Sequence, residues 1–264
     1  MPVANRNGTA LYWESEGSGQ PVLMIMGLSF TLDMWYRLRP VIVPRYRAIL
    51  FDNRGVGRSD TPLGPYSMRQ MAEDARAVLD AAGVESAFVM GASMGGMIAQ
   101  ELYFRHPHRV RALLLGCSGP SGLRSKLPEF RRVRALAQGF AAPITREERE
   151  WLIAPLLYSG DTPRERIADD IQVRLRHGLR RSGVLSQLAA ILTWSSYSQL
   201  PQIRVPTLVL HGDRDYILPL DNGRLLARHI PKAELVVVPG AGHVMATDAP
   251  EVVERETLRF LDNL

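Results

Sequence analysis

Cysteine is almost absent from this sequence, since Cys117 is the only one in 264 residues. One thiol cannot form an intrachain disulfide, and it cannot supply the several thiolates of a cysteine-based zinc site or an iron–sulfur cluster. We therefore expect neither a metal site nor another cofactor. A chain without disulfides fits a reducing compartment such as the cytoplasm.

Long apolar runs are also lacking. No stretch approaches the roughly 18–20 uninterrupted apolar residues that a membrane-spanning helix requires. The first eight residues, MPVANRNG, contain no apolar segment of the kind found in export signals. We expect a cytoplasmic protein that acts away from membranes. With 46% hydrophobic residues, the chain still has enough apolar material for the core of one α/β domain.

Acidic residues are few in one segment, so the net charge of the chain is unevenly placed. The net charge is +5, and residues 121–200 hold 13 Arg and Lys against 8 Asp and Glu. Their arginines alternate with acids and apolar residues, for example at 145–150, as on the solvated face of an amphipathic helix. Nucleic acid is therefore not an expected partner, whereas a small-molecule substrate is. The sequence does not specify an oligomeric state.

The order of elements indicates an α/β fold, in which a mostly parallel sheet is covered by helices on both faces. Short apolar runs alternate with longer helical patterns, and the middle runs are continuously apolar, as in strands buried on both faces. Strands are predicted at residues 10–14, 22–26, 48–52, 86–90, 110–115, 207–211 and 234–238. Ser67 and Gln70 have capping-box spacing, and Gly83 is expected to end the helix that follows at 71–82.

The alternation stops after residue 115 and resumes at 205. Residues 121–200 are Arg-rich and helical in pattern, so we interpret them as a helical cap inserted into the core domain. The core would then consist of residues 1–120 and 201–264.

The segment 89–96 follows a predicted strand and precedes a predicted helix. It contains the pattern Gly91-x-Ser93-x-Gly95, in which small residues permit a sharp turn that lifts a serine hydroxyl out of the sheet. The pattern alone also occurs in ordinary glycine-rich turns. Its position after a central strand favours Ser93 as a nucleophile.

A serine hydroxyl needs a base within hydrogen-bond reach and a third group that orients the base. Asp213 and Asp215 follow the strand predicted at 207–211, and His243 follows the last strand. The other five histidines fall at helix ends, in the cap or inside the His211-Gly-Asp pattern, where structural roles are more common. The order Ser, Asp, His resembles that of the alpha/beta-hydrolase superfamily.

The resemblance extends from the loop at Gly27 to the C-terminal helix. It implies that Asp215, rather than Asp213, is the catalytic acid, because the family pattern Gly-Asp-x-Asp places the acid at the second aspartate. Asp213 is then expected to hold the loop together. Some members place the acid one strand earlier, but residues 116–120 contain no carboxylate.

Attack on a carbonyl creates an oxyanion, which needs two preorganised N–H donors. The backbone of Met94, at a helix N-terminus, is expected to supply one, and that of Leu28 in the early loop the other. Members of the superfamily commonly carry His-Gly in that loop, whereas this chain reads Met26-Gly27. The histidine side chain is missing, but the backbone donor remains.

The segment 52–60 matches the family pattern Asp-x-Arg-Gly-x-Gly-x-Ser. Glycines and arginines also bind phosphates, but the Lys-Ser/Thr of a nucleotide loop is missing. A structural turn is expected here, without a nucleotide.

Five apolar side chains are predicted to line a substrate pocket. They flank the oxyanion loop, the acid and the base, or lie in the cap above them: Met26, Phe30, Ile217, Val244 and Trp194.

A serine nucleophile indicates acyl chemistry through an acyl-enzyme, and the substrate is expected to be small and largely apolar. The chain is similar to bacterial 3-oxoadipate enol-lactonases, aclacinomycin-type methylesterases and non-haem peroxidase-type esterases. Perhydrolase activity in the last group goes with a proline where this chain has Leu28-Ser29, so hydrolysis of an ester or lactone is preferred. A C–C bond hydrolase, a perhydrolase, or a ligand-binding module with a vestigial triad remain the alternatives.

Overall fold

The computed structural model describes residues 2–127, 134 and 144–264. One sheet runs through the molecule in the order β1-β2-β4-β3-β5-β6-β7-β8. β1 and β2 pair antiparallel, as do β2 and β4, and all other neighbours are parallel. The strands are β1 (Val3–Arg6), β2 (Thr9–Glu16), β3 (Pro21–Ile25), β4 (Arg47–Phe51), β5 (Ala87–Ala92), β6 (Val110–Gly116), β7 (Thr207–Gly212) and β8 (Ala233–Val238).

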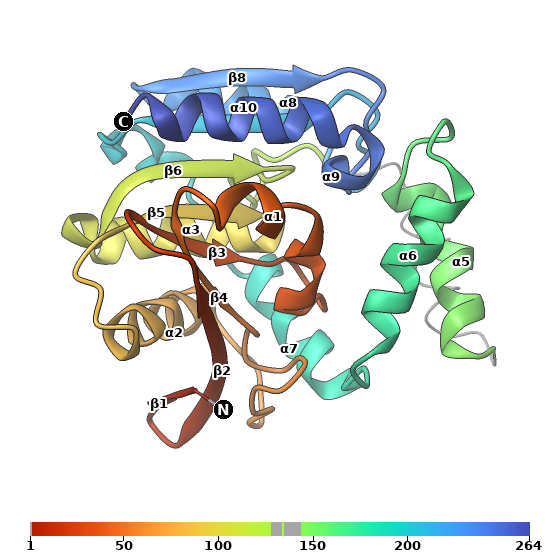
Figure 1. The fold of residues 1–264 in the computed structure, drawn as a ribbon, viewed down its shortest axis with the longest axis horizontal. Helices are drawn as coiled ribbons and strands as arrows, with labels where there is room; N and C mark the ends of the chain where they lie inside the picture. The colour runs from red at the N-terminus through yellow and green to blue at the C-terminus, as the bar shows by residue number, and fades with distance from the viewer. Residues whose placement is uncertain (1, 128–133, 135–143) are drawn as a thin grey trace.

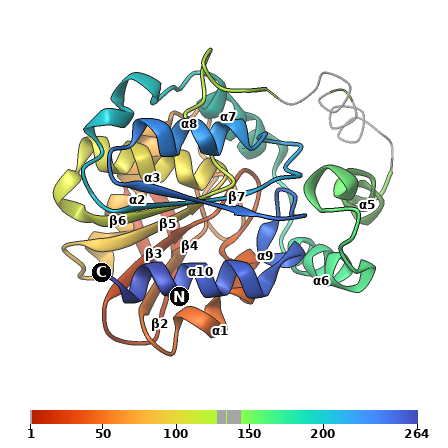
Figure 2. The same ribbon diagram turned by 90° about the horizontal axis from the view of Figure 1, so that it is seen from above.

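Helices cover both faces of this sheet, with α2, α3 and α8 on one side and α1 and α10 on the other (Figure 2). The helices are α1 (Arg39–Ile42), α2 (Met68–Ala81), α3 (Met94–Arg105), α5 (Arg146–Leu157), α6 (Arg164–Leu175), α7 (Arg181–Leu192), α8 (Asp221–His229), α9 (Met245–Asp248) and α10 (Pro250–Asp262). Short 3₁₀ turns are η1 (Leu32–Arg37), η2 (Pro107–Arg109) and η3 (Tyr197–Gln202). The predicted α/β fold is confirmed.

Side-chain alternation along the strands divides the core into two apolar layers. Leu23 and Ile25 of β3 pack into one layer, and Val22 and Met24 into the other. All four are fully buried, as expected for a central strand covered on both faces. The predicted strands are all present, with ends that differ by at most two residues.

Two local features test the sequence patterns. Ser67 and Gln70 form the predicted capping box at the start of α2. Strand β1 was not predicted, because it has only four residues and alternating burial. Its signal is the dipeptide Asn7-Gly8, both with positive φ, which turns the chain from β1 into β2.

The segment between β6 and β7 contributes α5, α6 and α7. Figure 1 shows α5 and α6 beyond the ends of the strands toward which the arrows of β6 and β8 point. In parallel sheets this is the edge where the loops that carry functional residues meet. None of the helices in the described part of the chain is long and apolar enough to cross a lipid bilayer.

Candidate active site

Ser93 lies between the end of β5 and the start of α3, with φ 56° and ψ −120°. These angles correspond to the first central position of a type II′ turn, which glycine normally occupies. The flanking glycines allow the helix to approach the sheet closely. A Cβ atom on Gly95 would lie 2.0 Å from the carbonyl oxygen of Ile25, and one on Gly91 would lie 2.3 Å from that of Gly95. The sharp turn predicted from the sequence is therefore present.

His243 and Asp215 lie on loops that follow β8 and β7, next to Ser93. His243 Nε2 is 3.0 Å from Ser93 Oγ, and His243 Nδ1 is 2.8 Å from Asp215 Oδ2. With the Nδ1 proton donated to the carboxylate, Nε2 of the neutral ring is free to accept the serine proton. The structure thus brings the three predicted residues into one hydrogen-bonded chain.

Asp215 is held by its own loop. Its Oδ1 accepts hydrogen bonds of 2.9 Å from the backbone N–H groups of both Ile217 and Leu218, while Oδ2 faces His243. The neighbouring His211 is fully buried and has Nε2 2.7 Å from the carbonyl oxygen of Leu218. Burial lowers the pKa of His211 although Asp215 acts in the opposite direction. Because His211 is then neutral, it does not compete with His243 for an ion pair with Asp215.

Asp213 lies on the same loop but points elsewhere. Its Oδ1 accepts a hydrogen bond of 2.7 Å from Gly240 N, on the loop that leads to His243. As expected from the sequence, this aspartate joins the two loops.

The loop after β3 places Gly27, the residue before Leu28, beside Ser93. A Cβ atom on Gly27 would lie 3.1 Å from Ser93 Cβ, so the two backbones nearly touch. Within the described residues, neither the Leu28 nor the Met94 backbone N–H has an acceptor. Both predicted donors are therefore available to a ligand next to Ser93 Oγ.

Three side chains from two segments, the turn after β4 and helix α7, hold the loop that carries Leu28. Asn53 Nδ2 donates to the carbonyl of Met26 at 2.9 Å, and Asp52 Oδ1 accepts from Leu32 N at 2.8 Å. Gln187 of α7 accepts from Ser29 N at 3.0 Å and donates to the carbonyl of Arg54 at 2.8 Å. These contacts support the loop without the histidine that the family commonly has. They also use 52–54 as structural residues, as predicted.

Gln187 was not identified from the sequence. It is fully buried in a helix whose neighbouring residues are mostly apolar. A polar side chain at a buried helical position was the available signal, but its partners lie more than 130 residues away in sequence.

The cap also contacts the backbone of the loop that carries the base. The carbonyl oxygen of Leu157, at the end of α5, accepts from His243 N at 2.8 Å and from Val244 N at 3.0 Å. Asp248 Oδ2 accepts from Gly242 N at 2.6 Å and from Ser159 N at 3.2 Å. The loop that carries the base is thus fastened to the segment that follows α5. No sequence pattern predicts bonds to a backbone carbonyl.

The predicted pocket residues separate into three groups. Phe30, Ile217 and Val244 pack together against an apolar cluster of the cap. That cluster consists of Ile153, Ala154, Leu157 and Tyr158. Met26 belongs to the core layer that contains Val22. Trp194 packs against the other core layer and donates to Glu101 on α3, so the structure does not bring it to the other four.

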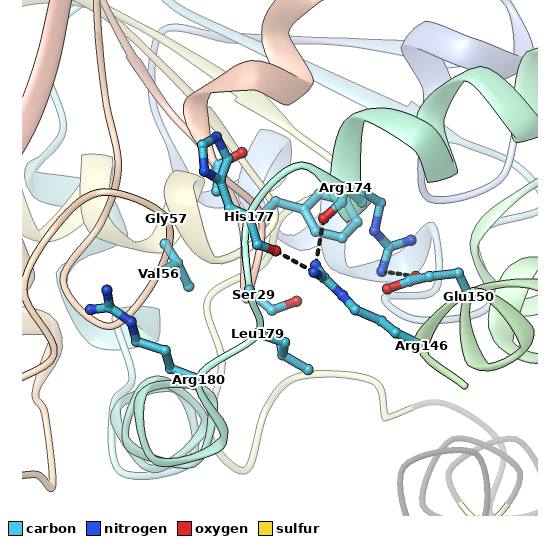
Figure 3. Close-up of a pocket in the computed structure, with 12 residues that line it drawn as sticks. Ser29, Val56, Gly57, Arg146, Glu150, Arg174, His177, Leu179 and Arg180 are labelled. Atoms are coloured by element: carbon cyan, nitrogen blue, oxygen red, sulfur yellow. Dashed lines mark hydrogen bonds and ion pairs between the residues drawn. The ribbon is translucent and has the colours of Figure 1, made fainter. Parts of the chain in front are cut away.

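A cavity lies between the loop at 29–31, the turn at Val56 and Gly57, and the cap (Figure 3). Its cap wall is formed by α5, the end of α6 and the residues that follow. The lining residues are Ser29, Phe30, Thr31, Val56, Gly57, Arg146, Glu150, Arg174, His177, Gly178, Leu179 and Arg180. The sequence analysis identified only Phe30 among them.

Other reactive groups do not form a second site nearby. Cys117 is buried, and burial raises the pKa of its thiol, so it is not a nucleophile at neutral pH. In the part of the chain that the structure describes, no group of three or more His, Cys, Asp or Glu residues is arranged to hold a metal ion.

Comparison with known proteins gives consistent matches over nearly the whole chain. A family model described as the alpha/beta hydrolase fold matches residues 20–250. A protein of Azorhizobium caulinodans with the provisional name carbamate hydrolase RutD is 31% identical over 267 residues, which cover 98% of both chains. The poly(3-hydroxyalkanoate) depolymerase of Ectopseudomonas oleovorans is 31% identical over 91% of this chain and 84% of its own.

Among solved structures, the enol-lactonase from Burkholderia xenovorans LB400 superposes with a TM-score of 0.86 at 25% identity. The match covers 99% of this chain and 100% of the lactonase.

Proposed function

The chain belongs to the alpha/beta hydrolase family, and on this premise we propose that it is a serine hydrolase that cleaves a carboxylic ester or lactone through an acyl-enzyme. The main support is the hydrogen-bonded chain from Ser93 Oγ through His243 to Asp215, beside the free N–H groups of Leu28 and Met94. In this proposal, Ser93, His243 and Asp215 are catalytic, and the two backbone N–H groups form the oxyanion hole.

In the first step, Ser93 Oγ bonds to the carbonyl carbon while its proton passes to His243 Nε2. The carbonyl oxygen becomes an oxyanion, which accepts hydrogen bonds from Leu28 N and Met94 N. Asp215 stabilises the imidazolium that forms. The tetrahedral intermediate then releases the alcohol, which takes the proton from His243, and leaves the acyl group on Ser93.

In the second step, water gives a proton to His243 Nε2 and bonds to the acyl carbon. The new tetrahedral intermediate expels Ser93 Oγ, which regains the proton, and the carboxylic acid leaves. With a lactone, the alcohol of the first step stays on the same molecule, so the product is a hydroxy acid.

The surroundings of the triad favour a small substrate with an apolar part next to the scissile bond. Phe30, Ile217 and Val244 face the apolar cluster of the cap. The relatives named as depolymerase and enol-lactonase act, by their names, on an ester polymer and a lactone. We also propose that residues 1–120 and 201–264 form the core domain and that 121–200 form a cap that selects the substrate.

The test is a series of p-nitrophenyl esters and lactones with the wild type, Ser93→Ala and Asp215→Asn. Loss of a triad member is expected to lower kcat by about 10⁴-fold or more. A fluorophosphonate should label the wild type and not Ser93→Ala.

Three outcomes would contradict the proposal. Equal turnover by the wild type and Ser93→Ala would exclude Ser93 as nucleophile. Ligand binding without turnover or labelling would instead support a binding module. The enzyme could also cleave a C–C bond, or form a peracid from hydrogen peroxide, with a higher kcat/KM than for ester hydrolysis. The triad would then be assigned to that reaction.

A further inference from the structure

Positive charge is in excess in the cavity of Figure 3. Three arginines line it, Arg146, Arg174 and Arg180, together with one carboxylate, Glu150. Arg180 is exposed, and among the described residues it donates to neutral oxygens, those of Ser59 and Thr61. A cavity of this composition attracts an anion.

Arg174 is nearly buried, with 8% of its side chain exposed. Its guanidinium lies over the ring of Phe30, 4.3 Å from the centroid, and forms an ion pair of 2.5 Å with Glu150. Its Nη1 is buried and has no hydrogen-bond partner among the described residues. A buried charged donor without an acceptor is costly, so a further acceptor at this position would be stabilised.

Arg146 has no direct counter-ion among the described residues. Its two terminal nitrogens donate to the backbone carbonyls of His177 and Arg174, which are neutral (Figure 3). Its Nε is buried and has no partner in the described chain. Burial lowers the pKa of Arg146. The negative charge of Glu150 raises this pKa, and the positive charge of nearby Arg174 lowers it. Glu150 is therefore paired with Arg174, and the charge of partly buried Arg146 is not balanced by a direct ion pair with a described residue.

The cavity adjoins the proposed oxyanion hole. Ser29 and Phe30 line it and directly follow Leu28 in the chain, and Phe30 N donates to the carbonyl of Gly27, which lies against Ser93. The cavity thus starts one residue beyond the loop position expected to bind the carbonyl oxygen of a substrate at Ser93. The planar edge of a guanidinium matches a carboxylate, to which it donates two parallel hydrogen bonds.

We propose that this cavity binds a carboxylate of the substrate, so that the preferred substrates are anionic esters or lactones with a free acid group at the end of a short chain. This inference rests on the proposed hydrolase function, because it names the substrate class of that same site. Arg146 and Arg174 bind the carboxylate, and the apolar cluster contacts the chain between it and the scissile carbonyl.

The experiment compares mono-p-nitrophenyl esters of succinate, glutarate and adipate with uncharged p-nitrophenyl esters of the same chain length. The wild type should have a kcat/KM at least tenfold higher for one of the charged esters, because a charge-assisted hydrogen bond contributes about ten- to a hundredfold in binding. Two variants test the arginines: Arg146→Gln, and the double variant Arg174→Gln with Glu150→Gln, which leaves the net charge unchanged. In both, the ratio of kcat/KM for the charged ester to kcat/KM for the uncharged ester should fall about tenfold, mainly because KM for the charged ester rises.

Matched controls separate the cavity from general charge effects. Arg176→Gln removes an exposed arginine at the end of the same helix α6, outside the cavity, and should leave the ratio unchanged. Arg146→Lys retains the charge and should recover part of the preference. Circular dichroism identifies any variant that does not fold, and the other arginine variant then decides.

A wild type without preference for any charged ester would overturn the inference and leave the proposed hydrolase intact. So would an equal fall of the ratio in Arg176→Gln. If no ester is turned over and no fluorophosphonate label forms, the proposed function fails by itself. Calorimetric titration of the protein with glutarate then still tests the cavity. Glutarate binding to the wild type that is abolished in Arg146→Gln supports the inference. If glutarate does not bind to the wild type, the inference is overturned.

Discussion

The backbone at Ser93 offers a test of strain that is independent of any substrate. Its φ of 56° and ψ of −120° place a residue with a Cβ atom where glycine is favoured. Such a conformation costs on the order of 1–3 kcal/mol. Replacing Ser93 with glycine removes this cost, but a glycine loses about 0.5–1 kcal/mol more conformational entropy on folding than alanine does.

The informative comparison is therefore between Ser93→Gly and Ser93→Ala. Both variants lose the hydroxyl and its hydrogen bond to His243, so that loss cancels. The difference between the two contributions predicts that Ser93→Gly is more stable than Ser93→Ala by about 1 kcal/mol. In a chain of this size, that difference corresponds to a Tm higher by roughly 2–4 °C.

The free energy of unfolding is measured by urea titration monitored by circular dichroism, and the unfolding and refolding curves must coincide. A thermal scan at one protein concentration gives the Tm. Ser182, exposed in α7, serves as a control position because its backbone is helical. There the order should reverse, with alanine more stable than glycine by about 0.5–1 kcal/mol. If Ser93→Ala were as stable as Ser93→Gly, the strain argument would be refuted.

Two further predictions concern the loop support and pH. Gln187→Leu leaves the partly buried N–H of Ser29 and the buried carbonyl of Arg54 unpaired, so it should lower the free energy of unfolding by about 2 kcal/mol and also lower kcat/KM. Urea unfolding measures the first effect and ester kinetics the second. An unchanged kcat/KM would show that the loop keeps its position without Gln187. For Glu73, burial raises the pKa, but hydrogen bonds from Arg105 and His106 outweigh it and lower the pKa to about 2 from 4.5. Ionised Glu73 therefore stabilises the fold fully above pH 4.5, and this stabilisation is lost as the pH falls toward 2. Glu73→Gln should lower the free energy of unfolding by about 1 kcal/mol at pH 7 and by little near pH 2. A loss that is the same at both pH values would contradict this.

The predicted strands and the serine turn were accessible from the sequence because their causes are local. A strand buried on both faces must be apolar throughout, and the turn at Ser93 needs glycine at positions 91 and 95. The acid and the base follow because loops after parallel strands meet at one edge of the sheet.

The contacts of the cap could not be obtained in this way. Gln187 acts through residues that are distant in sequence, and Leu157 acts through a backbone carbonyl that every residue type possesses. Trp194 was predicted to line the pocket from its apolar ring, and no sequence pattern indicated that its indole N–H bonds to Glu101. Residues 128–133 and 135–143, part of the predicted cap, lie outside the described residues.

The attachment of the histidine loop to Leu157 and Ser159 has a consequence for engineering. Exchanging caps between relatives is an obvious route to new substrate ranges, since the proposed cap carries the cavity and the apolar cluster. A graft across the whole of 121–200 would also exchange the carbonyl that orients His243 and the N–H that pairs with Asp248. Chimaeras should therefore keep residues 157–159 from the parent that supplies the histidine loop, and recombine the cap on either side of them.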